Sequence, residues 1–194
     1  MSKSDANSAK KERNKTIRWV VVIFLVTIVI SGTISFTSDA LMANSTMLVA
    51  FIILLAIVLI GIFFDVIGVA VTSADERPFH SMAARKVPGA QESIRLLRNA
   101  ERVSSICNDV VGDICGVVSG SASATIAAQV LTNADFTWEQ FVPLLMSALV
   151  AGLTVGGKAI GKTFAMGSCT AIVHGVGKVI WAFTHLPQKR KKRS

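Results

Sequence analysis

Two aspartates, Asp109 and Asp113, lie inside a stretch that otherwise has the composition of a membrane-buried helix. The stretch runs from about Val103 to Leu131 and contains no other charged residue. A carboxylate at the centre of a membrane helix costs about 3 kcal/mol on insertion scales, so such residues usually face a cavity, a partner or an ion path. Their four-residue spacing places both side chains on one helix face, roughly 10 and 15 Å beyond Val103. This pattern predicts an intramembrane polar site.

Asp65 and Asn108 supply further oxygen atoms of the same kind. Asp65 follows the apolar run that begins at Met47, so it lies either at headgroup level or, if the helix continues to about Thr72, inside the span and facing the third helix. Magnesium and similar hard cations prefer carboxylate, amide and water oxygens. The candidate metal ligands are Asp65, Asn108, Asp109 and Asp113. A proton-sharing or helix-packing polar cluster uses the same residue types, and the types alone do not decide between the two.

The sequence offers little that resembles an enzyme. It shows no Ser/His/Asp arrangement, no metal-hydrolase motif and no phosphate-cradling loop, and its three histidines are isolated. Cys107, Cys115 and Cys169 have no metal-ligand spacing and are interpreted as small buried hydrophobic residues. We therefore expect no catalytic residues, no cofactor-binding residues and no enzymatic activity.

The composition is that of an integral membrane protein. Of the 194 residues, 52% are hydrophobic and only 16% are charged, whereas a soluble domain is normally about 25% charged. The net charge of +8 is concentrated at the two ends. The basic residues there are Lys3, Lys10, Lys11, Arg13, Lys15 and Arg18, and then Lys189, Arg190, Lys191, Lys192 and Arg193. Such ends are typical of cytoplasmic anchors at a membrane surface, and we do not expect a nucleic-acid partner.

Four apolar segments must position the polar residues. They are predicted over Ile17 to about Phe36, Met47 to about Thr72, Val103 to Leu131, and Phe141 to about Val155. The first is interpreted as a retained helix rather than a cleaved signal peptide, because it is too long and lacks a small-residue cleavage site. In the fourth, the spacing of Gly152 and Gly156 predicts close helix contact. The same holds for the ladder Gly112, Gly116 and Gly120 in the third.

The loops orient these segments. The connections around 37–46 and 132–140 carry acids and no base, whereas 73–102 carries six arginines or lysines, so the positive-inside rule predicts both termini in the cytoplasm of an inner (plasma) membrane. Within 73–102, Pro78 and Pro88 bracket a short helix-like piece, and the segment from Ser93 to Val103 is amphipathic. Thr163 to Leu186 is interpreted as an interfacial helix, with a fifth crossing as the alternative.

From about Met47 onward, the order of motifs resembles the transmembrane domain of the CorB/CorC and cyclin-M (CNNM) magnesium transporter family. Phe63-Phe64-Asp65 continuing to Ala70 and Ser73 is similar to the family's F-F-S-x-x-E-x-A-x-x-S. The segment 96–102, LLRNAER, is similar to L-L-x-x-P-E-R, and the segment 157–162, GKAIGK, to G-E-x-x-P-K. The resemblance covers roughly three quarters of the chain. It implies a homodimer in the lipid bilayer that binds or transports a divalent cation, with magnesium the expected ion.

The departures from the family pattern fall where the ion would bind. Asp65 replaces a serine, Gly68 replaces the glutamate of the first motif, and Lys158 replaces the glutamate of the last. The family's asparagine pair, in I-G-N-x-L-V-N, is matched either by Asn108 and Gly112 or by Gly112-Asp113 with Val117 at the second asparagine. Lys158 could occupy the site electrostatically, or the three aspartates could form a different cation site. The family's nucleotide-sensing CBS domains have no counterpart in this sequence.

The prediction is an all-α integral membrane protein with about four transmembrane helices and juxtamembrane amphipathic helices. Its parts are a basic cytoplasmic tail (1–16), an additional helix and outer loop (17–45), a CorB/CNNM-like domain (46–186) and a basic C-terminal tail (187–194). The expected function is divalent-cation transport or homeostasis. The alternative is a non-transporting scaffold or partner-binding protein that keeps the fold while Lys158 neutralises the ion site.

Overall fold

The computed structural model describes residues 3–43, 45–132 and 141–191, with side chains described in 13–42, 45–131 and 141–185. Within these ranges all regular secondary structure is helical, which confirms the predicted fold class. The elements are α1 (Lys3–Ala43), α2 (Met47–Ser73), α3 (Arg77–Ala84), α4 (Ala90–Arg98), α5 (Ala100–Ser105), the π-helix η1 (Ile106–Gly112), α6 (Asp113–Thr132), α7 (Phe141–Gly167) and α8 (Cys169–Lys191).

Four helical segments are long and apolar enough to cross a membrane, as the sequence predicts. They are Arg13–Met42, Met47–Ser73, Ala100–Leu131 and Phe141–Gly167. The last is longer than expected, since α7 continues for twelve residues beyond Val155 and carries Lys158 and Lys162 within the helix. The outer loop predicted at 132–140 lies, except for Thr132, outside the described residues.

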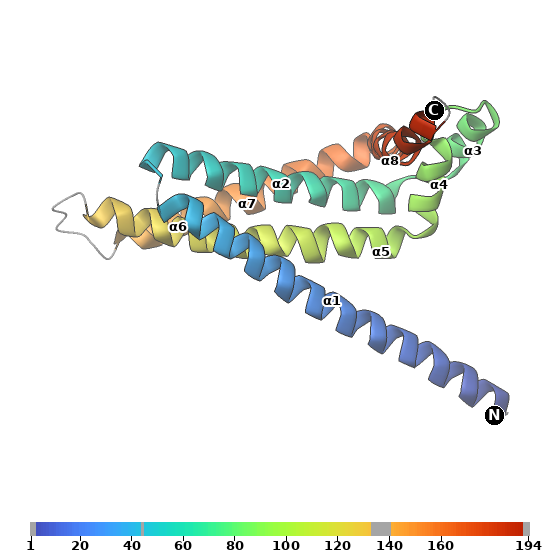
Figure 1. Ribbon diagram of the computed structural model, residues 1–194, viewed down its shortest axis with the longest axis horizontal. Helices are drawn as coiled ribbons and strands as arrows, with labels where there is room; N and C mark the ends of the chain where they lie inside the picture. The colour runs from blue at the N-terminus through green and yellow to red at the C-terminus, as the bar shows by residue number, and fades with distance from the viewer. Residues whose placement is uncertain (1–2, 44, 133–140, 192–194) are drawn as a thin grey trace.

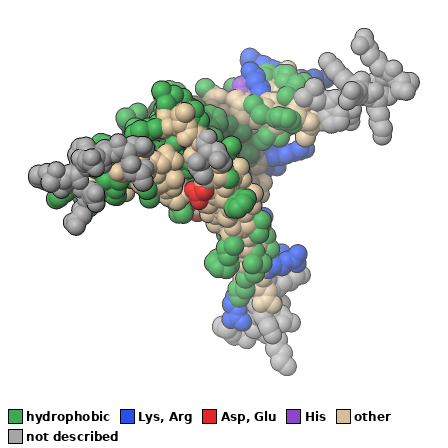
Figure 2. All heavy atoms as spheres, turned by 60° about the vertical axis from the view of Figure 1, so that its left-hand side comes forward, with side chains coloured by type: hydrophobic (Ala, Val, Ile, Leu, Met, Phe, Trp, Pro, Cys, Tyr) green, Lys and Arg blue, Asp and Glu red, His purple; other side chains and the backbone are tan. Residues whose placement is uncertain are grey.

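Helices α2, α6 and α7 pack against one another along their length, and α1 packs mainly on α6 (Figure 1). Met42, near the end of α1, is fully buried with Leu54, Val58 and Ile126 in one core cluster. The N-terminal part of α1 diverges from the bundle (Figure 1). Figure 2 shows hydrophobic side chains along α1, with basic side chains toward its outer end. A helix that exposes this much apolar surface is suited to lipid rather than to water.

Helices α2 and α7 approach closely through glycines of α7. A Cβ atom on Gly157 would collide with Ile62, and one on Gly161 would lie 2.7 Å from Cγ2 of Val66. The predicted contact at Gly152 and Gly156 is absent from the described residues, because nothing lies within 4 Å of a Cβ at either position. The contacting pair is therefore five residues further along, next to Lys158.

The third span is not a uniform α-helix. Residues Ile106–Gly112 are wound as a π-helix between α5 and α6. π-Helical turns are rare and occur frequently at functional sites. This one contains Asn108 and Asp109 and ends immediately before Asp113, so the irregular winding coincides with the polar residues that the sequence singles out.

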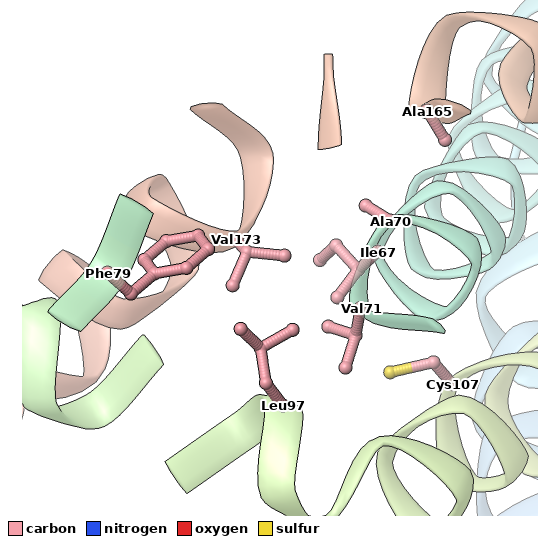
Figure 3. Close-up of a cluster of buried hydrophobic side chains, with 8 residues drawn as sticks. All are labelled: Ile67, Ala70, Val71, Phe79, Leu97, Cys107, Ala165 and Val173. Atoms are coloured by element: carbon pink, nitrogen blue, oxygen red, sulfur yellow. The ribbon is translucent and has the colours of Figure 1, made fainter. Parts of the chain in front are cut away.

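The remaining helices form a layer at one end of the bundle. Phe79 of α3, Leu97 of α4 and Val173 of α8 bury their side chains against Ile67 and Val71 of α2 (Figure 3). Helix α3 corresponds to the helix-like piece predicted between Pro78 and Pro88. Helices α4 and α5 together cover the amphipathic segment predicted from Ser93 to Val103. Helix α8 lies outside the four candidate spans and packs along α4 and the end of α2.

Glycine is required where α4 meets α8. Gly89 has a φ of 84°, a left-handed conformation that favours glycine, and a Cβ there would lie 2.5 Å from the backbone nitrogen of Lys178. On the other side of the contact, Gly177 leaves no room for a side chain beside Ser93. The Ser93 hydroxyl donates a hydrogen bond to the carbonyl of Gly89 at 2.9 Å, and it lies 3.2 Å from the carbonyl oxygen of Val173. The two helices are thereby held backbone to backbone.

Candidate polar site between α2, η1 and α7

Asp65 is a carboxylate buried inside the helical bundle. Helix α2 continues eight residues beyond it to Ser73, so Asp65 belongs to the interior of the helix and not to its end. Its side chain is only 6% exposed. The sequence left two positions open for this residue, and the structure places it in the interior, with Oδ1 3.9 Å from the position of a Cβ on Gly112 of the third span.

Lys158 of α7 provides the counter-charge. Its Nζ lies 3.6 Å from Oδ1 of Asp65, and its side chain is 22% exposed. At that distance the two groups form an ion pair but not a short hydrogen bond. Gly112 makes room for the ammonium, since a Cβ at that position would lie 3.2 Å from Nζ. A buried carboxylate without a positive partner would be strongly disfavoured, so this pair explains how Asp65 is accommodated.

Asn108 lies in the same α2–η1 interface, about one helical turn from Asp65. Its amide packs directly over Gly68, where any side chain would collide with it. Gly68 follows Asp65 by three residues and so lies on the same face of α2. The Nδ2 atom of Asn108 donates a hydrogen bond to Oγ of Ser104 at 3.1 Å. The lack of a side chain at Gly68 is therefore what allows Asn108 to pack against α2.

Two oxygen atoms of this interface have no hydrogen-bond partner among the described residues. They are Oδ2 of Asp65 and Oδ1 of Asn108, and both are buried. Buried polar atoms in folded proteins are nearly always satisfied, and exceptions call for an explanation such as an ion or an ordered water. A carboxylate oxygen and an amide oxygen are also the atom types that a hard cation prefers.

Asp109 and Asp113 point elsewhere. Both are exposed, on the same outward face as Val117. Oδ2 of Asp109 accepts a hydrogen bond from Oγ of Ser105 at 2.8 Å, which is a contact within its own helix. Two of the four candidate ligands, Asp65 and Asn108, thus lie in the α2–η1 interface, and the other two lie on the outward face of the third span.

The described residues contain no group of three or more His, Cys, Asp or Glu side chains positioned to hold a metal ion. Sequence reasoning did not predict two contacts of Asn108. Its amide donates a hydrogen bond to Ser104, and it packs over Gly68. The signal for Gly68 was present, because a glycine within an otherwise apolar helix usually has a packing reason.

Comparisons with models of protein families, with curated proteins and with solved structures find no match for this chain. The resemblance to the CorB/CNNM family accordingly stays a prediction from the motifs. The fold itself defines an all-helical protein with four candidate membrane spans. Its interior contains one aspartate–lysine ion pair between α2 and α7 among the described residues.

Proposed function

We propose that this protein serves divalent-cation transport or homeostasis in the membrane, with a magnesium-type ion as the substrate. The observation that carries the proposal is the pair of buried, unpartnered oxygens on Asp65 and Asn108. Magnesium usually keeps several waters and takes only one or two carboxylates from the protein, so the Asp65 carboxylate would be the main ligand, with the Asn108 amide as a second oxygen.

In this proposal, the ammonium group of Lys158 occupies the cation site when no metal is bound. Its ammonium is beside Asp65, and its partly exposed side chain is long enough to withdraw. A divalent ion and the ammonium cannot both lie against one carboxylate without strong repulsion. Cation binding would therefore displace Lys158, and the two would compete.

The second candidate function is a non-transporting membrane scaffold or partner-binding protein. It is favoured by the Lys158–Asp65 ion pair at 3.6 Å, which neutralises the carboxylate without any metal. In this case the pair is permanent and acts to hold α2 against α7. The fold, the bundle and the glycine contacts are the same under both proposals, so the ion response separates them.

The test is magnesium flux into liposomes that contain the purified full chain, together with thermal unfolding with and without magnesium. Transport predicts flux in the natural protein that is lost in Asp65→Asn and kept in Asp75→Asn, a matched change at an exposed carboxylate. At tenfold excess over its Kd, a bound ion should also stabilise the protein by about 1.4 kcal/mol. Absence of flux and of stabilisation, with a magnesium response that appears only in Lys158→Met, would instead establish the scaffold with a site closed by lysine.

We also propose a homodimer in the plasma (inner) membrane, with both termini cytoplasmic. The orientation is supported by the six basic residues of 73–102 and the basic ends of the chain. The dimer is supported by the outward face of α6, where exposed carboxylates lie near Gly116 and Gly120, two glycines with open space around them. Carboxylates at membrane depth favour a protein partner over lipid, and small residues permit close helix approach.

A further inference from the structure

A small pocket with three charged residues in its lining lies between α1 and α5, away from the Asp65 site. It has a volume of about 220 Å³ and is lined by Lys15, Thr16 and Trp19 of α1 and by Glu101 and Arg102 of α5. On both helices the pocket lies where the apolar span begins. Ile17 is the first residue of the first apolar run, and Val103 directly follows Arg102. Residues in such positions lie at the headgroup level of a membrane.

The pocket exists because α1 diverges from the bundle at this end (Figure 1). Deeper along the helix the gap closes, since Ile23 packs against the cluster of Val110, Ile114 and Val118. On either side of Ile23 along the chain, α1 has exposed apolar side chains such as Val20 and Phe24, which are 53% and 63% exposed. The pocket thus lies beside a helix that also exposes apolar side chains.

The charges of the pocket favour an anionic group. Lys15 and Arg102 contribute two positive charges against the single negative charge of Glu101. Among the residues with described side chains, neither Lys15 nor Arg102 forms an ion pair, so both cations are available to a ligand. A guanidinium binds phosphate through two parallel hydrogen bonds, and the indole N–H of Trp19 adds a donor.

Glu101 refines the choice of ligand. A carboxylate accepts hydrogen bonds but does not donate them, so it would repel a bare phosphate. It can, however, accept hydrogen bonds from hydroxyl groups attached beyond the phosphate. A headgroup with one phosphodiester and free hydroxyls matches the two cations and the one acceptor together.

We propose that the α1–α5 pocket binds the headgroup of an anionic glycerophospholipid of the phosphatidylglycerol type. Lys15 and Arg102 bind the phosphodiester, Glu101 accepts from the glycerol hydroxyls, and an acyl chain lies along the exposed apolar side chains of α1. Basic pockets between membrane helices are a common form of lipid recognition. The exposed apolar side chains of α1 favour a lipid over free phosphate, because free phosphate has no acyl chain to cover them.

The test uses the delipidated full chain in neutral detergent, titrated with phosphatidylglycerol or phosphatidylcholine. Trp19 fluorescence reports binding in a Trp138→Phe/Trp181→Phe background. We expect saturable binding of phosphatidylglycerol and none of phosphatidylcholine. Removing two charges in Lys15→Gln/Arg102→Gln should weaken binding about 30-fold. The control, Arg77→Gln/Arg85→Gln, removes two charges outside the pocket and should leave binding unchanged.

Three results would overturn the proposal. Equal loss in the control variant would assign binding to general surface charge. If phosphatidylcholine bound as tightly as phosphatidylglycerol, the net negative charge of the headgroup would have no role in binding. Competition by millimolar inorganic phosphate would identify a free phosphate site in place of a lipid site. A thermal unfolding curve of each variant confirms that the comparison is made on folded protein.

Discussion

The carboxylates of the second and third spans occupy opposite environments. Asp65 is buried between α2, η1 and α7, with Lys158 beside it, whereas Asp109 and Asp113 are exposed on the outward face of the third span. All three lie in segments that the sequence identifies as membrane-buried. Whether a carboxylate faces the bundle interior or the outside depends on its position around the helix axis, and composition does not report that position.

This difference determines how each carboxylate is stabilised. Asp65 depends on one specific partner, since a buried charge without one is strongly disfavoured. Asp109 is stabilised by a hydrogen bond from Ser105 in its own helix and by the surroundings of the outward face, such as a second copy of the protein. Changes at the interior pair should therefore alter the stability of the single chain, whereas changes at the outward pair should alter association.

The largest effect is expected from removing the partner of the buried carboxylate. Lys158→Met keeps the length of the side chain but leaves Asp65 unpaired in the interior. Loss of one member of a buried ion pair typically costs about 3 kcal/mol or more, and we expect a destabilisation of that size. Unfolding of the purified chain in detergent, followed by circular dichroism, measures it.

The double variant Asp65→Leu/Lys158→Met provides the control for this prediction. Replacing both charges by apolar groups should recover most of the loss, because no uncompensated charge remains. If Lys158→Met alone were as stable as the natural protein in the absence of divalent cations, Asp65 would not require Lys158 as its partner.

The second largest effect on stability is expected from alanine substitutions at a buried glycine and at an outward-facing one. Gly61→Ala would place a Cβ 2.8 Å from Cβ of Cys115, inside the α2–α6 interface, and should cost about 1–3 kcal/mol. Gly120→Ala, on the outward face with nothing within 4 Å, should stabilise the isolated chain by up to about 1 kcal/mol through helix propensity. If the free energy of unfolding falls in Gly61→Ala and rises in Gly120→Ala, Gly61 faces the interior and Gly120 faces outward. A loss of stability in both variants would contradict this.

The smallest effect on the single chain is expected at the outward pair. Asp113→Asn removes a charge from an exposed position and should change monomer stability by less than about 1 kcal/mol. Its effect should appear in association. Val117→Cys, in a background lacking the three natural cysteines, should crosslink to a second copy in membranes, and Asp113→Asn should alter the yield. Absence of any Val117→Cys crosslink would argue against a dimer through this face.

Much of the fold could be predicted from the sequence, because the four apolar segments and the charge of their connections are strong signals. The site could be predicted only in part. Sequence identifies Asp65, Asn108 and Lys158 as residue types with chemistry, but it cannot decide which faces of neighbouring helices meet. The π-helix over Ile106–Gly112 also had no recognisable signal, and it affects how each residue within it is oriented.

The glycine pairs show the same limit. Gly152 and Gly156 have the spacing of a contact motif, yet Gly157 and Gly161 make the contact with Ile62 and Val66. Spacing predicts that a helix can be approached closely. Which of two such pairs is used depends on the partner's side chains, and a single sequence does not specify their arrangement.

The cluster in Figure 3 has a mechanical consequence. Val173 of α8 and Leu97 of α4 are packed into the last two turns of α2, immediately after Asp65, while the backbone contact at Gly89 and Gly177 fastens α8 to α4. The layer and the end of α2 are therefore joined through one packed cluster, to which Ala165 of α7 also belongs. A displacement of α8 would be passed to α2 through these side chains, within two turns of Asp65 on the same helix.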